Sequence, residues 1–426
     1  MDKKIYIDTL GCSKNTYDSG VLAAGLVDKG CQIVFNPEEA DVLIVNTCGF
    51  IESAKRESIQ RIFELSSEKA DSKKQLIVTG CLSERYKDDL IKEMPEVDIF
   101  FGVDEYEKLI EVLTSEPTKV NGQYFDEGAY IGYLKIAEGC DNNCTFCAIP
   151  KIRGKYRSKP IEECLIEAKK MATFGIKELI IIAQDTSQYG IDLYGKVVLP
   201  KLLKELCKIE EFEMIRLMYV YDNGITDELI EVISSEDKIC KYIDIPIQHI
   251  SDNVLHRMNR RSTGKSIRET IKKLRIKIPG IHIRTTLLVG FPGETDSDFE
   301  ELLDFIDEYK IDRLGAFSYS DEDGTAAFNL DDKVDINVIE RRVDAVMQRQ
   351  MDISARINQD KIGKNYKVIV DEEIEKGIYA GRMEFDAPEI DCEVTFESKI
   401  PHVQGDIVNV IILNAFEYDL EGEEIL

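Results

Sequence analysis

The sequence lacks any long hydrophobic run. No apolar stretch approaches the roughly 18 uninterrupted residues that a membrane-spanning helix requires. The first residues, MDKKIYIDTLGC, also lack the profile of a secretory signal peptide, because they enter a strand-like pattern directly. We therefore expect a cytoplasmic protein that has no membrane partner.

Basic side chains are scarce as well. The chain has 54 Lys and Arg against 81 Asp and Glu, which gives a formal net charge of −27. A protein that holds nucleic acid through its phosphates needs a basic surface, so this balance argues against nucleic acid as the direct substrate. We expect a basic or uncharged partner, although the net charge does not exclude a local basic patch.

The cysteine content points to metal ligation. The 426 residues suffice for roughly two to four domains of about 150 residues each. Eleven cysteines in a chain without a secretion signal indicate thiols and metal ligands rather than a disulfide framework. Five of them share no spacing typical of a site, and we assign these to packing: Cys31, Cys164, Cys207, Cys240 and Cys392.

Three cysteines form a CxxxCxxC pattern. Cys140, Cys144 and Cys147 lie in the stretch IAEGCDNNCTFCAIPKIRGKYRS, which covers residues 136 to 158. Thiolate-only iron–sulfur clusters and closed zinc sites normally take four protein ligands, so three ligands leave one metal position open for chemistry. The alternatives are three buried thiols, or a zinc site whose fourth ligand comes from elsewhere in the chain.

Three further cysteines each follow a strand-like run. Cys12, Cys48 and Cys81 come after apolar runs that alternate with amphipathic helical stretches, and this order predicts a parallel sheet. The runs cover Lys4–Leu10, Asp41–Val45 and Gln75–Thr79. Because the carboxyl ends of parallel strands meet at one edge, we expect these thiols to converge in a second metal site. A glycine adjoins each cysteine and lets the backbone approach a cluster closely. The alternative is that each is a small buried side chain.

A second series of strands follows a linker. Residues 113 to 130 lose periodicity, and from residue 131 six strand-like runs alternate with helical stretches. The runs are Ile131–Ala137, Glu178–Ala183, Met214–Val220, Tyr242–Ile247, His282–Val289 and Arg313–Ser318. This order predicts a parallel sheet curved toward a barrel, with the site in loops at the carboxyl ends of the strands.

Polar loops follow several of these strands. The segment AQDTSQYG contains Gln184 and Asp185, which can hydrogen-bond an amino or carboxylate group. Gln248 ends a strand in IPIQHIS, and Gly290 and Gly293 form a turn in VGFPGET that lets the backbone approach a flat ligand. We assign these five residues to cofactor binding. The alternatives are a helix cap at Asp185 and a simple turn at the glycines.

Basic residues also follow the CxxxCxxC pattern. Arg153, Lys155 and Arg157 form a local basic patch in the sequence. Such a patch either holds the carboxylate of a cofactor or an acidic substrate group, or is simply solvated.

The C-terminal part has a different pattern. Asp335 to about Lys364 predicts one long amphipathic helix, and from Tyr366 short alternating runs predict a small antiparallel barrel of the OB type. Residues 365–426 carry 16 acidic and 4 basic side chains, a formal net charge of −12. Phosphate binding by this part is therefore disfavoured, and a basic protein target is favoured.

These motifs resemble one family. GCDNNCTFCAIPKIRGKYRS is similar to the cysteine loop of the radical S-adenosylmethionine (SAM) superfamily, in particular its methylthiotransferase branch. LGCSKNTYDS, NTCGF and TGC are similar to the N-terminal domain of that branch. The AIPKIRGKYRS and SKN segments resemble members that modify a ribosomal protein more than those that modify tRNA. One departure is Asp222 in LMYVYDNGIT, where the family pattern leads us to expect proline.

The resemblance implies SAM and two 4Fe-4S clusters as cofactors. One cluster is held by the CxxxCxxC cysteines, which we expect to be catalytic, with its fourth iron open to SAM. The other cluster is held by the three strand-end cysteines. Gln184 and Asp185 then lie near the methionyl part of SAM, and Gly290 and Gly293 lie near its adenine.

The implied architecture is of the α/β class and has three domains. A parallel-sheet α/β domain that binds a cluster covers residues 1–112, and a linker covers 113–130. A six-unit (βα) partial barrel of the radical SAM type, with a connecting helix, covers 131–364. A small antiparallel β-barrel, the TRAM domain, covers 365–426.

The implied function is transfer of a methylthio group to the β-carbon of an aspartate in a small-subunit ribosomal protein. SAM would be both methyl donor and radical source, a flavodoxin or ferredoxin would supply electrons, and the enzyme would be a monomer. Ribosomal proteins are basic, which suits the acidic chain. Two alternatives remain: a tRNA adenosine as the target of the same chemistry, and a non-catalytic iron–sulfur carrier or sensor, which leaves the barrel loops unexplained.

Overall fold

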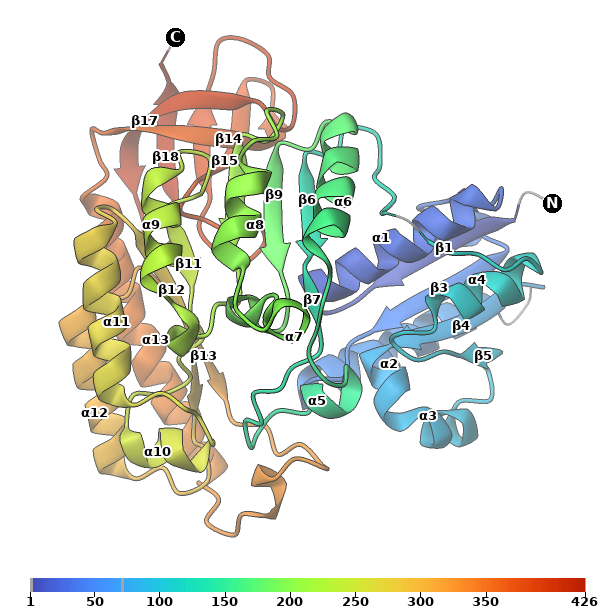
Figure 1. Ribbon diagram of the computed structural model, residues 1–426, viewed down its shortest axis with the longest axis horizontal. Helices are drawn as coiled ribbons and strands as arrows, with labels where there is room; N and C mark the ends of the chain where they lie inside the picture. Colours follow the sequence, from blue (N-terminus) through green and yellow to red (C-terminus); the bar gives the residue numbers. More distant parts are fainter. Residues whose placement is uncertain (1–2, 70–72, 121, 426) are drawn as a thin grey trace.

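The N-terminal part is a five-stranded parallel sheet with strand order β2-β1-β3-β4-β5 (Figure 1). The computed structural model describes residues 3–69, 73–120 and 122–425. The strands are β1 (Lys4–Thr9), β2 (Gln32–Ile33), β3 (Val42–Thr47), β4 (Gln75–Gly80) and β5 (Ile99–Phe100). The predicted parallel sheet is confirmed, and the two short edge strands are additional to the prediction.

Helices cover both faces of this sheet. They are α1 (Ser13–Asp28), α2 (Glu52–Lys69), α3 (Cys81–Glu93) and α4 (Tyr106–Thr114). In β3, Leu43 and Val45 pack in the apolar cluster that contains α2 and α3, whereas Val42 and Ile44 pack in the cluster that contains α1 and α4. A strand buried on both faces needs a continuous apolar run, which explains why its first four residues show no polar alternation.

The central part contains six strands that pair in parallel, as predicted. They are β6 (Ile131–Lys135), β9 (Glu178–Ile182), β10 (Met214–Leu217), β11 (Tyr242–Asp244), β12 (His282–Val289) and β13 (Arg313–Ser318). Hydrogen bonds divide them into two three-stranded sheets, β10-β9-β6 and β11-β12-β13. An isolated parallel bridge joins Ile215 of β10 to Ile239, three residues before β11, so the two sheets lie side by side.

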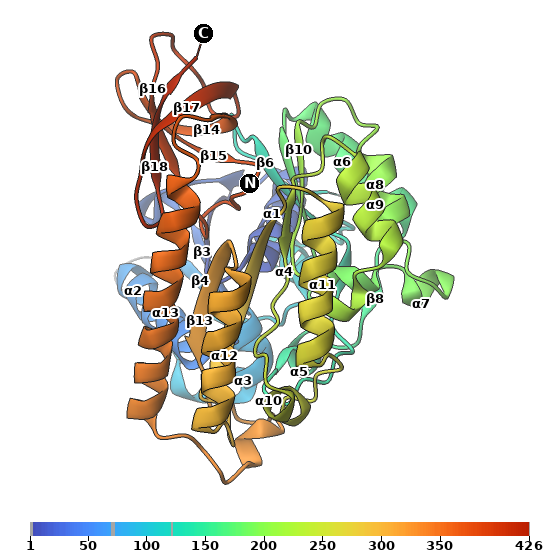
Figure 2. The same cartoon turned by 90° about the vertical axis from the view of Figure 1, so that its left-hand side faces the viewer.

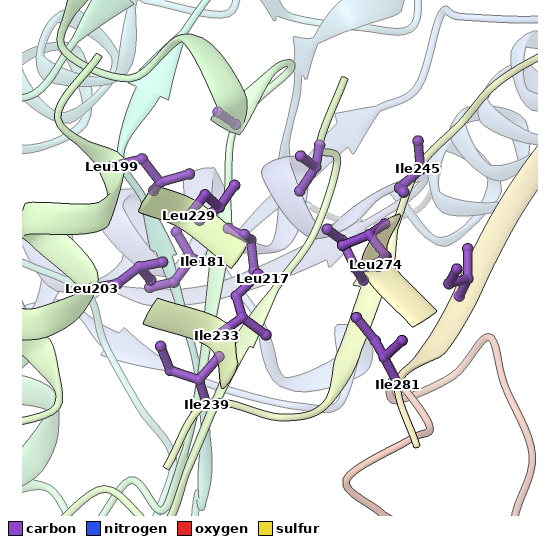
Figure 3. Packing of buried hydrophobic residues seen from close by; sticks show 14 of the residues in the cluster. Ile181, Leu199, Leu203, Leu217, Leu229, Ile233, Ile239, Ile245, Leu274 and Ile281 are labelled. Carbon is purple, nitrogen blue, oxygen red and sulfur yellow. The ribbon is translucent and has the colours of Figure 1, made fainter. Parts of the chain in front are cut away.

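Helices pack on the outside of the central strands. They are α6 (Ile161–Thr173), α8 (Leu199–Leu206), α9 (Asp227–Ser235), α11 (Gly264–Lys277) and α12 (Asp296–Tyr309). Figure 3 shows Ile181 of β9 and Leu217 of β10 beside Leu203 of α8 and Leu229 of α9 in one buried apolar layer. This layer joins strands to helices and leaves the loops at the carboxyl ends of the strands to carry polar residues. None of the described helices has the length and apolar character needed to cross a membrane.

Helix α13 (Ile336–Gln359) runs beside α12 and leads to the C-terminal part (Figure 2). That part is a closed barrel with neighbour order β14-β15-β16-β18-β17, antiparallel except for the parallel pair β16 and β18. Its strands are β14 (Asn365–Glu375), β15 (Ile378–Met383), β16 (Val394–Glu397), β17 (Ile407–Ala415) and β18 (Leu420–Glu424). The predicted small barrel is confirmed, whereas the domain limits at residues 112, 130 and 364 stay predictions.

Ion pairs attach the C-terminal barrel to the central strands. Glu178, the first residue of β9, is fully buried between Arg216 of β10 at 2.7 Å and Arg382 of β15 at 2.9 Å. Arg313 of β13 pairs with Asp386, in the segment after β15, at 2.7 Å. Acidic residues of the barrel are thus partly used inside the molecule. The two pairs use one basic residue of residues 365–426, Arg382, and one acidic residue, Asp386, so they leave the formal net charge of −12 unchanged.

We expect Glu178→Gln to lower the free energy of unfolding by about 3–5 kcal/mol, because a neutral amide leaves two buried guanidinium groups without their shared counter-ion. Urea unfolding followed by circular dichroism measures this change. Glu423→Gln is the control, since Glu423 pairs with Lys399 on the surface at 3.5 Å. We expect the control to stay within about 0.5 kcal/mol of the unchanged protein. Equal stability of the two variants would contradict a structural role for the buried pairs.

Candidate active site

Cys12, Cys48 and Cys81 converge at one edge of the N-terminal sheet. Cys12 lies between β1 and α1, Cys48 follows β3, and Cys81 begins α3 directly after β4. These three strands are neighbours in the sheet, so their carboxyl ends bring the three thiols together. Burial, together with the nearby thiols of Cys81 and Cys12, raises the pKa of Cys48 to about 11.

Glycines let these cysteine segments pack closely. A Cβ atom on Gly11, whose φ is +95°, would lie 2.7 Å from the Cβ atom of Cys48. A Cβ atom on Gly49 would lie 2.7 Å from the backbone of Leu82, the residue after Cys81. The segments thus touch at positions where any side chain would push them apart.

The CxxxCxxC segment forms a loop between β7 (Ala137–Glu138) and α5 (Ile149–Ile152). The backbone N–H of Thr145 donates to the carbonyl oxygen of Met258 at 3.0 Å. This bond ties the loop to the end of the short helix α10 (Asp252–Arg257), which follows β11. The three cysteines of the loop are therefore held against the carboxyl ends of the central strands.

The donor chemistry of both triads fits iron–sulfur clusters. Each triad offers only thiols, which is the ligand set that such clusters take. Burial raises the pKa of Cys140 to about 11 and that of Cys147 to about 12, so these thiols lose their protons when a strongly bound cation replaces them. No three His, Cys, Asp or Glu side chains in the described ranges are arranged around a single metal ion. A cluster, in contrast to one ion, holds its thiolates apart by the width of its core.

A cavity of about 250 Å³ is lined by residues from both cysteine-bearing segments. Phe50, two residues after Cys48, lines it from the N-terminal part, and Phe146 of the CxxxCxxC loop lines it from the central part. Gln248 and Phe317, at the ends of central strands, also form its wall. The backbone of Gln248 has a φ of +70°, which is uncommon for a residue other than glycine. This cavity therefore lies between the segments that carry the two cysteine sites.

An ion-pair group includes one residue of the cavity wall, Glu322. Glu322, in the loop after β13, pairs with Lys55 of α2 at 3.0 Å and with Arg85 of α3 at 2.8 Å. Arg85 also donates to the carbonyl oxygen of Gly49 at 3.0 Å. Sequence reasoning missed this contact, because Arg85 and Glu322 lie 237 residues apart and neither belongs to a motif.

Gln184 and Asp185 support the CxxxCxxC loop. The amide nitrogen of Gln184 donates to Glu138 Oε1 at 2.6 Å, just before the loop. Asp185 Oδ2 accepts from the side chain of Asn142 within the loop at 2.5 Å, and its Oδ1 accepts from the N–H of Ser187 at 3.0 Å. Asp185 thus has the helix-capping role that the sequence left open, and contact of these two residues with SAM stays a prediction.

The two glycines of the VGFPGET turn pack against protein. A Cβ atom on Gly290, at a φ of +79°, would lie 2.3 Å from the side chain of Ile339 in α13. On Gly293, at a φ of +83°, it would lie 2.4 Å from the guanidinium group of Arg257. Both glycines are therefore required by the packing of the turn itself, and contact between their backbone and adenine stays a prediction.

The expected basic patch after the cysteines does not form. Arg153 is 3% exposed and points toward α1, where it pairs with Asp18 at 2.6 Å. Arg157 is exposed and pairs with Asp104 at 2.8 Å. Lys155 is exposed as well. The short helix α5 turns Arg153 inward, so three basic residues close in sequence have separate environments.

Asp222 has a specific place in the loop where proline was expected. It begins a short 3-10 helix and accepts from the hydroxyl of Ser262 at 2.7 Å and from Arg260 at 3.4 Å. The guanidinium group of Arg260 lies 4.0 Å above the ring of Tyr221. Burial raises the pKa of Cys144, and Arg260 opposes this rise. Sequence reasoning missed Arg260, because a basic run such as MNRR does not indicate where its side chains point.

Comparison with family models identifies the three parts. Residues 4–102 match "Uncharacterized protein family UPF0004", residues 134–306 match the radical SAM superfamily, and residues 362–425 match the TRAM domain. Among solved structures, the radical SAM methyltransferase TsrM from Kitasatospora setae has a TM-score of 0.59 at 13% identity. That match covers 75% of each chain, and at such low identity it shows a shared fold alone.

Curated relatives match over nearly the whole chain. Ribosomal protein uS12 methylthiotransferase RimO of Clostridioides difficile (strain 630) is 47% identical, over 99% of this chain and 98% of the relative. The protein of the same name in Thermoanaerobacter sp. (strain X514) is also 47% identical, over 99% of this chain and 100% of the relative. The chain therefore belongs to the RimO family of methylthiotransferases and is a radical SAM transferase, an enzyme class that uses SAM and iron–sulfur clusters.

Proposed function

We propose that this chain transfers a methylthio group to the β-carbon of an aspartate in ribosomal protein uS12. The observation that carries the proposal is the cavity lined by Phe50, two residues after Cys48, and by Phe146, next to Cys147. A radical source and a sulfur carrier must reach one carbon atom, and two cofactor sites on one cavity supply that proximity. Full-length relatives at 47% identity carry the name of this activity.

The six triad cysteines are the proposed cluster ligands. Cys140, Cys144 and Cys147 hold one 4Fe-4S cluster with an iron open to SAM, and the three strand-end cysteines hold a second 4Fe-4S cluster. When bound, these groups and SAM supply one-electron cleavage of SAM and the sulfur that is transferred. The CxxxCxxC cysteines are catalytic residues in this proposal, because they touch the cofactor.

SAM binding is assigned to Gln184, Asp185, Gln248, Gly290 and Gly293. Gln184 supports this assignment, because its buried carbonyl oxygen Oε1 has no hydrogen-bond partner among the described residues. An ammonium group such as that of the methionyl part of SAM supplies the donor that this oxygen lacks. Gln248 supports it through its position in the cavity wall.

Aromatic side chains keep water from the reacting atoms in this proposal. Phe50 and Phe317 line the cavity and are 37% and 51% exposed, so they are available to contact a bound substrate. Phe146 lines the same cavity from within the cysteine loop. Exclusion of water protects a reactive intermediate from side reactions.

The proposed partners follow from charge and from the chemistry. The chain has a net charge of −27, which suits a basic ribosomal protein as substrate. One-electron cleavage of SAM needs an electron donor, and we assign this role to a flavodoxin or ferredoxin. The proposed enzyme acts in the cytoplasm as a monomer.

The direct test is the intact mass of uS12 from cells with and without this gene, alongside nucleoside analysis of their tRNA. We expect uS12 to carry a mass increment of methylthio size only when the gene is present, with tRNA unchanged. An increment in tRNA instead of uS12 would replace the proposal by the tRNA-modifying alternative.

Substitution of one cysteine in each triad separates the two proposed roles. We expect Cys144→Ser to abolish the cleavage of SAM to 5′-deoxyadenosine under dithionite, because the cluster that binds SAM loses a ligand. Cys48→Ser should keep that cleavage and lose methylthiolation of uS12. Cys164→Ser, a buried cysteine outside both triads, should keep both activities. Loss of SAM cleavage in Cys48→Ser, with its barrel cluster intact, would contradict this division.

A glycine substitution tests whether the strand-end cysteines share a cluster. We expect Gly11→Ala to lose about half of the iron bound after anaerobic reconstitution, because the added methyl group separates Cys12 from Cys48. Gly30→Ala is the matched control: its φ is +81°, similar to the +95° of Gly11, but its Cβ atom would have nothing within 4 Å. Both variants carry the strain of a positive φ, and only the first blocks the site. Full iron content in Gly11→Ala would show that the approach of the two segments is not needed.

A further inference from the structure

Four charged side chains between the two cysteine sites form a closed group, which we call the Arg153 network: Asp18, Lys135, Glu138 and Arg153. Arg153 Nη1 lies 2.6 Å from Asp18 Oδ2 and 3.2 Å from Glu138 Oε2. Lys135 pairs with the same two carboxylates. The side chains of Arg153 and Asp18 are 2% and 1% exposed, so two cations and two anions balance each other away from solvent.

The network touches the strand-end cysteines. Arg153 Nη2 donates to the sulfur of Cys81 at 3.4 Å and to Asn15 Oδ1 at 2.7 Å. The side chain of Asn15 then donates to the carbonyl oxygens of Leu10 at 2.7 Å and Thr47 at 3.1 Å. Those two carbonyl groups lie at the ends of the strands that lead to the other two cysteines. Arg153 and Asn15 therefore reach all three strand ends of the N-terminal site.

The same network holds both ends of the CxxxCxxC segment. Glu138 lies two residues before Cys140, and Arg153 directly follows the helix after the loop. Glu138 is tied to Lys135 of β6 at 2.5 Å and to Gln184 at 2.6 Å. Arg153 thus lies next to the barrel loop in sequence, whereas its side chain contacts the N-terminal thiol site.

We propose that Arg153 is a positioning residue for the N-terminal cluster, which fixes Cys81, raises the reduction potential of that cluster and joins the two cysteine sites rigidly. The inference rests on the proposed role of the strand-end cysteines as cluster ligands. A hydrogen bond to a ligand sulfur and a nearby positive charge both favour the reduced, more negative cluster. Arginine stays charged at any accessible pH, so its effect on the cluster is permanent.

The charge of Arg153 affects the cluster more than the charges of its counter-ions do, because Arg153 contacts a ligand sulfur. It alone among the four charged groups donates to a cysteine sulfur, at 3.4 Å. Without Arg153, Lys135 faces the two carboxylates of Asp18 and Glu138. The buried group then carries one net negative charge. At low effective dielectric such an excess acts strongly on a neighbouring cluster.

The test is a redox titration of the reconstituted holoenzyme followed by electron paramagnetic resonance, with the signal of each cluster assigned in variants that lack the other triad. In Arg153→Gln we expect the midpoint potential of the N-terminal cluster to fall and that of the barrel cluster to stay. The double variant Arg153→Gln with Asp18→Asn keeps the pocket neutral, and its N-terminal potential should fall by less. Arg157→Gln is the control from the same segment, because the side chain of Arg157 is exposed and pairs with Asp104.

The outcomes separate this inference from the proposed function. An N-terminal potential that is unchanged in Arg153→Gln, with full iron content, overturns the inference. If Arg153→Gln does not take up iron, the potential of the N-terminal cluster is measured in the neutral double variant instead. A wild-type potential in that double variant overturns the inference. Absence of iron at the N-terminal triad of the unchanged protein would defeat the ligand assignment itself. Iron at both triads without modification of uS12 would defeat the proposed function and leave the role of Arg153 intact.

Discussion

The contact between Asp18 and Arg153 is the interaction on which the arrangement of the two cysteine sites depends. Asp18 belongs to α1, the helix that begins directly after Cys12, and Arg153 follows the helix after the CxxxCxxC loop. The two side chains meet at 2.6 Å with almost no exposure to solvent. A buried pair of this kind is costly to break, because removal of one partner leaves an uncompensated charge. The pair therefore fixes the N-terminal sheet against the central barrel at the place where both carry thiols.

The two parts meet at the carboxyl edge of the N-terminal sheet and along α1, whose Tyr17 packs with Ile180 and Ile182 of β9. In each part large apolar clusters pack between strands and helices. The loops at the carboxyl ends of the strands can therefore carry the residues that bind ligands. A second contact, from Glu322 to Lys55 and Arg85, joins the parts beside the cavity. Glu322 also lines the cavity, together with Phe50 and Phe146 from the two cysteine-bearing segments. The third part, the C-terminal barrel, is fastened to the central strands by buried pairs such as Glu178 with Arg382.

Much of this architecture could be predicted from the sequence, because its strongest signals are local. Apolar runs of strand length, each ended by a cysteine, predict thiols at one edge of a parallel sheet, and Cys12, Cys48 and Cys81 lie there. The six strands of the barrel and the small C-terminal barrel follow from the same alternation of patterns. Short strands such as β2 and β18 were missed, since two residues, or a run of acidic residues, carry little pattern.

The directions of polar side chains could not be predicted, because distant partners decide them. The sequence predicts that Arg153 is part of a basic patch. Its side chain instead pairs with Asp18, which lies 135 residues away, in the interface between the two parts. Asp185 reads as a ligand for SAM, and its carboxylate also holds the side chain of Asn142. The number of acidic residues in the C-terminal barrel suggests an acidic surface, although one of them, Asp386, is buried and pairs with Arg313. In each case the sequence gives the residue type but does not reveal the partner of the side chain.

The central claim is that both cysteine triads hold clusters that face one cavity. Phe50, near Cys48, and Phe146, between Cys144 and Cys147, line that cavity together. The most direct measurement is the electron paramagnetic resonance spectrum of the fully reduced enzyme, compared with the sum of spectra from two variants that each lack one triad. We expect the spectrum of the intact enzyme to differ from that sum through magnetic interaction between the clusters. A spectrum equal to the sum, with iron at both sites, would contradict the account.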